Sequence, residues 1–178
     1  NNINNNNEFK EYPTNVTLLW NKIPLVLHKT GPIETMQEPF LSTSWESARM
    51  LGCSVVKYYN DTDCERYIKK HFPRRVLRAF KSLIPGAYRA DMFRFCVLAA
   101  EGGIYQDLSQ KMLVPLDVNR FNADLFLAMD RSMNLRKGIQ ISFMASVPNN
   151  KFLYYVVEEI TKSVLNREYG RGPLDITG

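Results

Sequence analysis

Three charged side chains near the middle of the chain have the types and spacing of a phosphate- and sugar-binding site. Asp91 and Arg94 are three residues apart, so they share one face of a helix. Asp107 follows the β-favouring pair Ile104–Tyr105, at the carboxyl end of a predicted strand, where open α/β sheets bind ligands. A carboxylate there can hold a divalent cation against a diphosphate, and the Asp/Arg pair can hydrogen-bond sugar hydroxyls.

The elements that must position these residues are a helix, a glycine break and a short strand. The sequence predicts a helix over Ala87–Glu101 and a strand over Ile104–Asp107. Gly102 and Gly103 end the helix, because glycine readily adopts the left-handed conformation found just beyond a helix. Asp91 and Arg94 therefore lie on the predicted helix, and Asp107 ends the strand that follows it. We expect the three residues to act as one unit.

The rest of the chain alternates strand and helix signals. Strands are predicted at Ile23–His28, Ser54–Tyr59, Leu125–Met129 and Ile139–Val147, the last of them inside the sheet. Helices are predicted at Phe40–Leu51, from a capping box at Thr62–Glu65 to His71, at Pro73–Leu83 and at Lys151–Leu165. This alternation predicts an α/β fold, a mostly parallel sheet flanked by helices on both faces. We expect one domain over residues 21–178, preceded by an asparagine-rich, disordered or extended tail over residues 1–20.

Composition narrows the class of protein without choosing one. The 178 residues are 45% hydrophobic, which suits a single packed domain. A formal charge of +5 suits an anionic ligand such as a nucleotide diphosphate, and equally an acidic surface. Basic residues are not interleaved with aromatic ones as in nucleic-acid binders, so no nucleic-acid partner is expected. Three cysteines without paired spacing support neither a disulfide framework nor a zinc site.

The sequence does not indicate where in the cell the protein is located. No apolar run reaches the roughly 20 residues of a membrane-spanning helix, so we expect no membrane span in this sequence. No leader segment is recognisable either. The cytoplasm and the lumen of the secretory pathway remain equally compatible with the chain.

A basic stripe is predicted on one face of the helix over Pro73–Leu83. Arg74, Arg78 and Lys81 recur at helical spacing on that face. The stripe is either a solvated surface or a docking site for an acidic acceptor, and the sequence leaves both readings open.

The stretch from Arg89 to Ser109 resembles the DXD-containing glycosyltransferases. This group includes initiating α-1,6-mannosyltransferases, α-1,4-galactosyltransferases and large bacterial glucosylating toxins. Their shared core reads approximately R-A/S-D-x-x-R, a short apolar helix, then G-G-x-Y-x-D-x-D; the chain has R-A-D-M-F-R and G-G-I-Y-Q-D-L-S. The segment Ile23–His28 is similar to the opening strand of the family, and the resemblance extends to Gly178.

The resemblance implies a GT-A-like, Rossmann-type fold and a retaining transferase. Such an enzyme moves a hexose from a UDP- or GDP-linked sugar to a glycan or glycoprotein acceptor with Mn²⁺ or Mg²⁺. By this resemblance Asp107, Asp91 and Arg94 are the catalytic candidates, and Asp107 with Ser109 the metal ligands. The residues expected to bind the nucleotide sugar are His28, Lys29, Thr30, Asn60, Tyr88, Arg89, Asp91, Arg94, Gly102, Gly103, Tyr105 and Asp107.

Structural roles compete with several of these assignments. Asp107 has the residue type of an ordinary turn, and Asn60 that of a helix N-cap. Asp91 and Arg94 also suit a simple helical ion pair. Tyr105 is either a strand residue of the core or a platform beside the nucleotide base, and Arg89 either contacts phosphates or fastens the fold.

The chain departs from the family pattern in three places. Ser109 stands where relatives have the second aspartate, so this position offers a neutral hydroxyl in place of a charged ligand. Gly31 follows the opening strand where many relatives carry a tryptophan. The given sequence also ends at Gly178, where relatives continue with further metal and acceptor contacts. The alternative reading is therefore a nucleotide-sugar-binding module of the same fold with weakened turnover.

Overall fold

The computed structural model describes residues 22–32, 34, 37–130 and 138–168 of the chain. Within this part, five strands form one sheet, in the order β2-β1-β3-β5-β4. The predicted tail over residues 1–20 and the residues after 168 lie outside the described residues. The strands are β1 (Val26–Thr30), β2 (Val55–Tyr59), β3 (Gly103–Gln106), β4 (Leu125–Asp130) and β5 (Gly138–Ser146).

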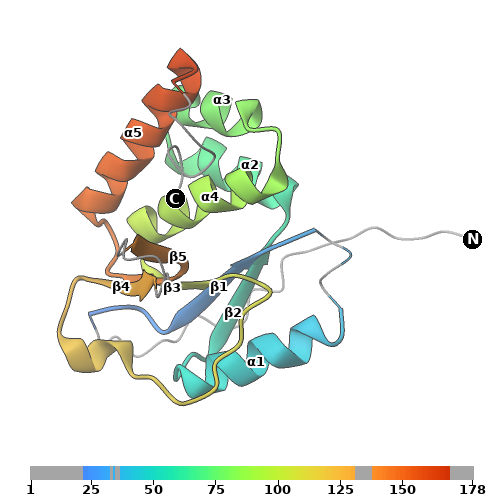
Figure 1. The fold of residues 1–178 in the computed structure, drawn as a ribbon, viewed down its shortest axis with the longest axis vertical. Coiled ribbons are helices and arrows are strands. Elements are labelled where there is room, and N and C mark those ends of the chain that lie inside the picture. Colours follow the sequence, from blue (N-terminus) through green and yellow to red (C-terminus); the bar gives the residue numbers. More distant parts are fainter. Residues whose placement is uncertain (1–21, 33, 35–36, 131–137, 169–178) are drawn as a thin grey trace, which may run out of the picture.

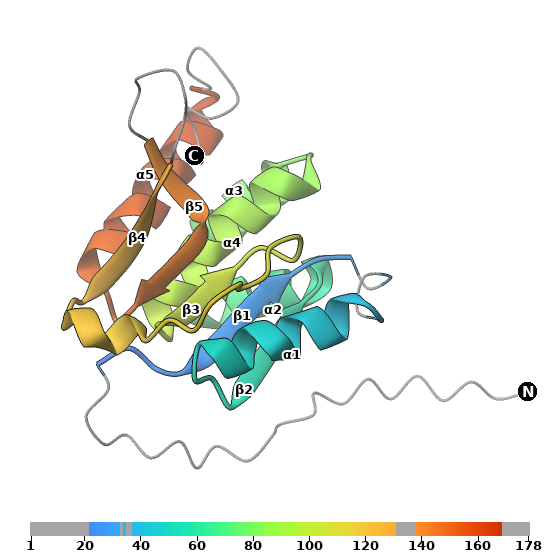
Figure 2. The ribbon, with the colours of Figure 1, turned by 60° about the horizontal axis from the view of Figure 1, so that its bottom comes forward.

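The sheet is mixed because of one reversed strand. β1 pairs in parallel with both β2 and β3, whereas β5 pairs antiparallel with both β3 and β4. Four strands therefore run in one direction, and β5 runs against them from the interior of the sheet. The α/β prediction is confirmed, and the carboxyl ends of β1, β2 and β3 lie along one edge of the sheet (Figure 2).

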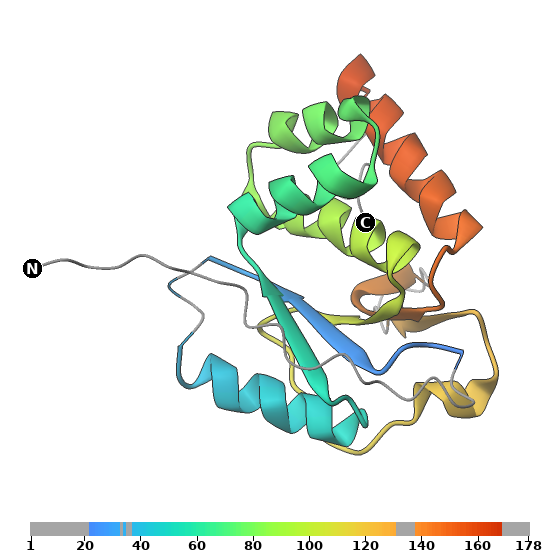
Figure 3. The same cartoon turned by 180° about the vertical axis from the view of Figure 1, so that it is seen from behind.

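Helices cover the sheet in two unequal layers (Figure 1, Figure 3). One layer is α1 with the short 3-10 helix η2, and four helices form the other. The bounds of the first two are Phe40–Met50 and Val118–Phe121. The larger layer holds α2 (Asp61–His71), α3 (Arg74–Ser82), α4 (Gly86–Ala100) and α5 (Lys151–Asn166). The sheet thus separates two hydrophobic cores, one under each layer.

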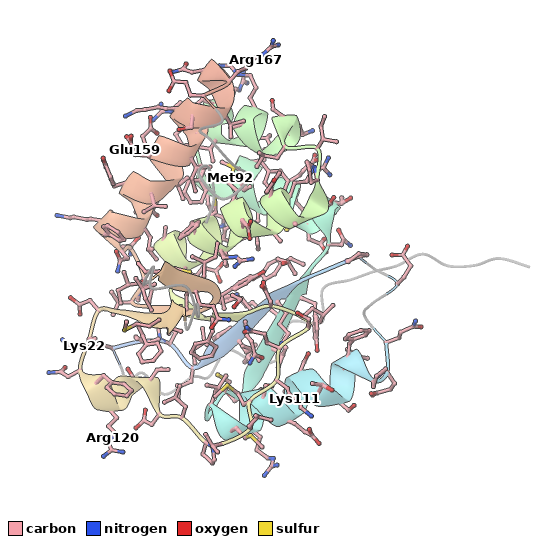
Figure 4. The ribbon with its side chains drawn as sticks, in the orientation of Figure 1. Lys22, Met92, Lys111, Arg120, Glu159 and Arg167 are labelled. Carbon is pink, nitrogen blue, oxygen red and sulfur yellow. The ribbon has the colours of Figure 1, made fainter. Side chains whose placement is uncertain are left out.

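Helix α4 is the centre of the larger layer. Its residues from Met92 to Ala99 are all buried, because the sheet lies on one side of the helix and α2, α3 and α5 surround the other (Figure 4). A helix enclosed in this way needs no polar face. The alternation of β3 then divides its side chains between the cores, with Tyr105 under the larger layer and Ile104 under α1.

The predicted start of α2 is wrong by two residues. Asn60 is the N-cap: its side-chain oxygen accepts a hydrogen bond from the Asp63 amide at 3.0 Å. The Asp63 carboxylate accepts in return from the Asn60 amide at 3.2 Å. Both Thr62 and Asn60 are suitable capping residues, and the structure uses Asn60, which directly follows the end of β2 at Tyr59.

Helices long and apolar enough to cross a bilayer do not occur in the described part of the chain.

Candidate functional site

One arginine joins the two carboxylates that the sequence analysis selected. Helix α4 carries Asp91 and Arg94, and Asp107 is the first residue after β3. Nη2 of Arg94 lies 2.6 Å from Oδ1 of Asp91 and 3.0 Å from Oδ1 of Asp107. The arginine side chain is 4% exposed, whereas those of Asp91 and Asp107 are 18% and 30% exposed. A buried cation therefore lies between two carboxylates that solvent still reaches.

Tyr105 supports this arginine from inside the protein. The guanidinium carbon of Arg94 lies 4.9 Å from the centre of the Tyr105 ring, in cation–π contact. The Tyr105 hydroxyl shares a hydrogen bond of 2.7 Å with Oγ1 of Thr30. Burial raises the pKa of Tyr105, so its hydroxyl stays protonated. The ring is fully buried, so a contact of Tyr105 with the nucleotide stays a prediction. Nε of Arg94 is also buried and has no hydrogen-bond partner among the described residues.

A buried lysine lies beneath the turn that carries Asp107. Nζ of Lys29 donates to Oε1 of Gln106 at 2.8 Å and to the Asp107 carbonyl at 3.2 Å. It also lies 3.5 Å from the Gln110 carbonyl. Burial lowers the pKa of Lys29 to about 8, and nearby Asp107 opposes this shift. Lys29 was expected to contact the nucleotide; its ammonium group holds the turn from below, and a role in nucleotide binding stays a prediction.

The turn itself runs from Asp107 to Gln110. The Gln110 amide donates to the Asp107 carbonyl at 3.0 Å, which places Ser109 third in a four-residue turn. Strand β5 fastens both ends: the Asp107 amide donates to the Ser142 carbonyl at 2.9 Å, and Nε2 of Gln110 to Oγ of Ser142 at 2.7 Å. Ser109 is exposed at the tip. Hydrogen bonds from within the turn, to β5 and from Lys29 thus fix the backbone of Asp107, and with it the position of the carboxylate.

The residues of this turn fit a metal ion only together with a ligand. In the described ranges no group of three or more histidine, cysteine, aspartate or glutamate residues is arranged to hold a metal. Asp107 offers one carboxylate, already shared with Arg94, and Ser109 a neutral hydroxyl. Mg²⁺ is commonly bound by one or two carboxylates plus substrate phosphates. The donor set therefore suits a cation that arrives with a diphosphate.

His28 is a neutral, buried part of the scaffold. Its Nε2 lies 3.1 Å from the Gly102 carbonyl, which can only accept, so Nε2 carries the proton. Its Nδ1 then accepts from the Tyr59 hydroxyl at 3.1 Å. Burial lowers the pKa of His28 to about 4, so the ring is uncharged at neutral pH. Its polar atoms are used within the protein, and contact with the nucleotide stays a prediction.

The two glycines of the motif are required by close packing. Gly102 and Gly103 have φ angles of +68° and +96°, which side chains rarely tolerate. A Cβ atom at Gly102 would lie 2.5 Å from the Pro148 nitrogen, and one at Gly103 would lie 2.8 Å from Nε2 of His28. The structure therefore gives both glycines a role in joining α4 to β3.

The remaining predicted binding residues lie where β1 and β2 end and where α4 begins. Thr30 pairs with Tyr59, so Asn60, the next residue, lies at the same edge of the sheet and caps α2 there. Arg89 contacts Asp61 at 2.6 Å and donates to the Leu83 carbonyl at 2.7 Å, which fastens the start of α4. Tyr88 is half-buried against the larger core. Nucleotide binding by these residues stays a prediction.

Sequence reasoning missed the glutamines around the turn. Gln106 ends the otherwise apolar strand Gly103–Gln106 and is buried, so a polar residue in a buried strand was the available signal. Gln106 and Gln110 line a hollow of about 470 Å³ beside the turn, together with Gln140 of β5. This hollow lies on the side of the sheet that α1 also covers, and Gln110 at the end of the Asp107 turn lines it.

Comparison with known proteins agrees with this fold and places the chain in a family. The fold is similar to that of the solved structure "PaToxG Glycosyltransferase", with a TM-score of 0.61 and 14% sequence identity. That match covers 88% of this chain and 66% of the other, so the chain spans just under two thirds of that protein. The family model described as "Glycosyltransferase sugar-binding region containing DXD motif" matches residues 9–125, and the chain belongs to this family. No match was found among curated protein sequences.

Proposed function

We propose that the chain binds a nucleotide-diphosphate sugar, UDP- or GDP-linked, and transfers its hexose with retention to a glycan or glycoprotein acceptor. Membership of the glycosyltransferase family supports a transferase of this kind. The observation that carries the proposal is the Arg94 guanidinium, which lies between Asp91 and Asp107 at the carboxyl edge of the sheet. In α/β folds this edge is where ligands bind.

Each residue of this cluster has a role in the proposal. Asp91 accepts hydrogen bonds from hydroxyls of the donor sugar, and Arg94 donates to the sugar or to the oxygens of the diphosphate. Negative charge grows on the diphosphate as the bond to the anomeric carbon breaks. A fixed cation in a site screened from water stabilises that charge without having to reorganise. The burial of Arg94 against Tyr105 keeps it in place for this purpose.

Asp107 and Ser109 would hold Mn²⁺ or Mg²⁺ together with the diphosphate. The ion would supply charge neutralisation at the phosphate oxygens. Lys29 and Ser142 fix the turn on which both residues lie, so their contribution is to orient the ligands.

Replacement of Asp107 tests the proposal directly. Asp107→Ala should remove the thermal stabilisation that a nucleotide sugar with Mn²⁺ gives, because ligands that bind the native state raise its stability. A panel of UDP- and GDP-sugars, with and without Mn²⁺, is the measurement. Asp124→Ala is the matched control, since this exposed carboxylate lies before β4 at the opposite edge and pairs only with Lys22, at 3.5 Å, among the described ion pairs. Equal stabilisation of the Asp107 variant and the parent would reduce Asp107 to a turn residue.

A binding module with little turnover is the second candidate, and Ser109 favours it. The neutral hydroxyl at the tip of the turn lacks the charge that a second aspartate would bring. Hydrolysis of the donor in the absence of an acceptor distinguishes the two functions, because a pure binding module leaves the sugar attached.

Restoring the carboxylate tests the role of the serine. Ser109→Asp should lower the Mn²⁺ concentration for half-maximal donor binding several-fold, since affinity for hard cations rises with ligand charge. The measurement is a Mn²⁺ titration at fixed nucleotide sugar, with Ser109→Asn as the uncharged control. A titration curve identical to that of the parent would show that Ser109 is not a replaced metal ligand.

A further inference from the structure

A basic hollow lies between helices α2 and α3, on the helical layer and apart from the Arg94 cluster. Its volume is about 770 Å³. The residues that line it are Lys69, Arg74, Leu77, Arg78, Lys81 and Ser82. Four of these six carry a positive charge, and the half-buried Leu77 is the apolar member. The hollow is thus lined mainly by cationic side chains, with one apolar side chain among them.

Among the described residues, three of the four cations have no acidic partner. Lys81 pairs with Glu65 at 2.7 Å. Within the described ranges, Lys69, Arg74 and Arg78 form no ion pair, and α3 itself contains no acidic residue. Like charges gathered around one hollow repel each other, so an anionic partner would be attracted there.

The start of α3 adds to this positive field. Arg74 and Arg75 occupy the first helical turn, where the backbone already carries partial positive charge. The N-cap residue Pro73 makes no side-chain cap, so no carboxylate of the helix offsets this charge. Arg75 is paired with Glu158 of α5 at 2.8 Å, which leaves Arg74 facing the hollow.

The chain segment between α3 and α4 leads from the hollow toward the edge of the sheet that carries the candidate site. The α3–α4 connection leads from Ser82 to the start of α4 at Gly86, and Arg89 holds it by donating to the Leu83 carbonyl. In Figure 1 this connection and the carboxyl end of β1 lie on the same side of the molecule. A chain lying along α3 could therefore extend toward Asp91, which is in the second turn of α4.

We infer that the hollow between α2 and α3 docks an acidic segment of a polypeptide acceptor. This inference rests on the proposed transferase function, because it names the class of acceptor for that site. Arginine and lysine clusters recognise acidic or phosphorylated motifs through charge-assisted hydrogen bonds. A concave surface lined by cations and one apolar side chain fits an extended acidic chain that inserts side chains, whereas a flat lipid surface would meet only its rim.

The test measures peptide binding without any donor. A fluorescent peptide of alternating glutamate and serine is titrated into the parent and into the double variant Arg74→Gln/Arg78→Gln. We expect the variant to bind at least about tenfold more weakly, because two charge-assisted contacts are lost together. A control variant, Arg120→Gln/Lys151→Gln, removes the same charge from exposed positions and should bind like the parent. Arg120 lies at the end of the molecule opposite α3 (Figure 4).

Three outcomes would overturn the inference. The first is equal peptide binding by the parent and the Arg74/Arg78 variant, and the second is an equal loss in the control variant. The third is binding to phosphatidylserine vesicles or to a polynucleotide that exceeds binding to the peptide and depends on the same two arginines. Thermal shift with nucleotide sugar, run on the same variant, should match the parent. Failure of the parent itself to bind any donor would refute the proposed function and leave the peptide result standing.

Discussion

The two ends of strand β3 use polar residues in opposite ways. At its start, His28 is neutral, both ring nitrogens are hydrogen-bonded, and Gly102 and Gly103 are packed too closely for any side chain. At its other end, Arg94 and Lys29 are buried as cations and Asp107 reaches solvent. Nε of Arg94 has no hydrogen-bond partner in the part of the chain that the structure describes. The first end is satisfied and closed, whereas the second holds charge that a ligand could use.

The motif from residue 91 to residue 107 therefore contains residues of two kinds, one needed for packing and one suited to ligand binding. Residues 102–103 connect α4 to β3, and their requirement is steric. Residues 91, 94 and 107 carry charge in a place where burial makes it costly, which is typical of functional sites. Substitutions at the first end should therefore change stability, and those at the second should change ligand binding.

The largest effect is expected at Gly102. Gly102→Ala forces a Cβ atom to within 2.6 Å of the Ser146 carbonyl oxygen at a φ of +68°. We expect a loss of roughly 4 kcal/mol or more in the free energy of unfolding, measured by urea denaturation, because backbone atoms on both sides must move. Gly86→Ala is the control, since nothing lies within 4 Å of a Cβ atom there and Gly86 begins α4. A Gly102→Ala variant as stable as the parent would refute the steric requirement at this end.

The next largest effect is a loss of stability in mild acid. The pKa of His28 is about 4 in the folded protein and about 6.5 when unfolded, so the unfolded state binds more protons between these values. Stability is therefore present at neutral pH and lost as the pH falls from about 6.5 toward 4. From this group we expect a decrease of about 2 kcal/mol in the free energy of unfolding between pH 7 and pH 5.

Urea denaturation at both pH values checks this expectation. His71→Gln is the control, because it removes the only other histidine, which is exposed. The decrease should persist in that variant. Its disappearance would assign the acid sensitivity to His71.

The smallest effect on stability, and a distinct effect on binding, is expected at Lys29. Lys29→Met removes three hydrogen-bonded contacts but also ends the burial of a charge. These terms oppose each other, so the free energy of unfolding should change by less than about 2 kcal/mol. Donor binding with Mn²⁺ should weaken about tenfold, because the Asp107 turn loses its support from below.

Calorimetry with a nucleotide sugar and Mn²⁺, beside urea denaturation, separates the two effects. Lys111→Met is the control, since replacing this exposed lysine removes the same charge next to the turn. An equal loss of binding in both variants would mean that charge near the turn matters and its support does not. Unfolding of the Lys29→Met variant would show that Lys29 is needed for stability, as Gly102 and Gly103 are.

Periodicity and glycine signals predicted most of the helices and strands. The opening strand, expected over Ile23–His28, is Val26–Thr30, and the short helix η2 was not predicted. The helix expected over Ala87–Glu101 is Gly86–Ala100, and the strand expected at Ile139–Val147 is Gly138–Ser146. The reversed direction of β5 could not be read, because a buried strand has the same apolar pattern whichever way it runs. The cap of α2 was placed two residues late, since Asn60 and Thr62 both have capping chemistry.

The candidate site was predictable where its residues are close in sequence. Asp91, Arg94 and Asp107 were expected to act together, and one guanidinium joins them. Lys29 was harder to place, because its role depends on which face of the sheet its side chain lies on, and neighbouring His28 points to the other face. Contacts from Ser142 depend on pairing between β3 and β5, for which no local signal exists.

The contacts that Lys29 and Ser142 make with the Asp107 turn limit the transfer of the sequence motif to another protein. A segment from Ala87 to Ser109 contains nearly every recognisable residue of the family, and in a different host it would still lack the ammonium of Lys29 and the carbonyl of Ser142. Those two groups come from strands on either side of β3, far away in the sequence. A transfer of this site to another protein therefore has to include β1, β3 and β5 together with α4, which supplies Arg94.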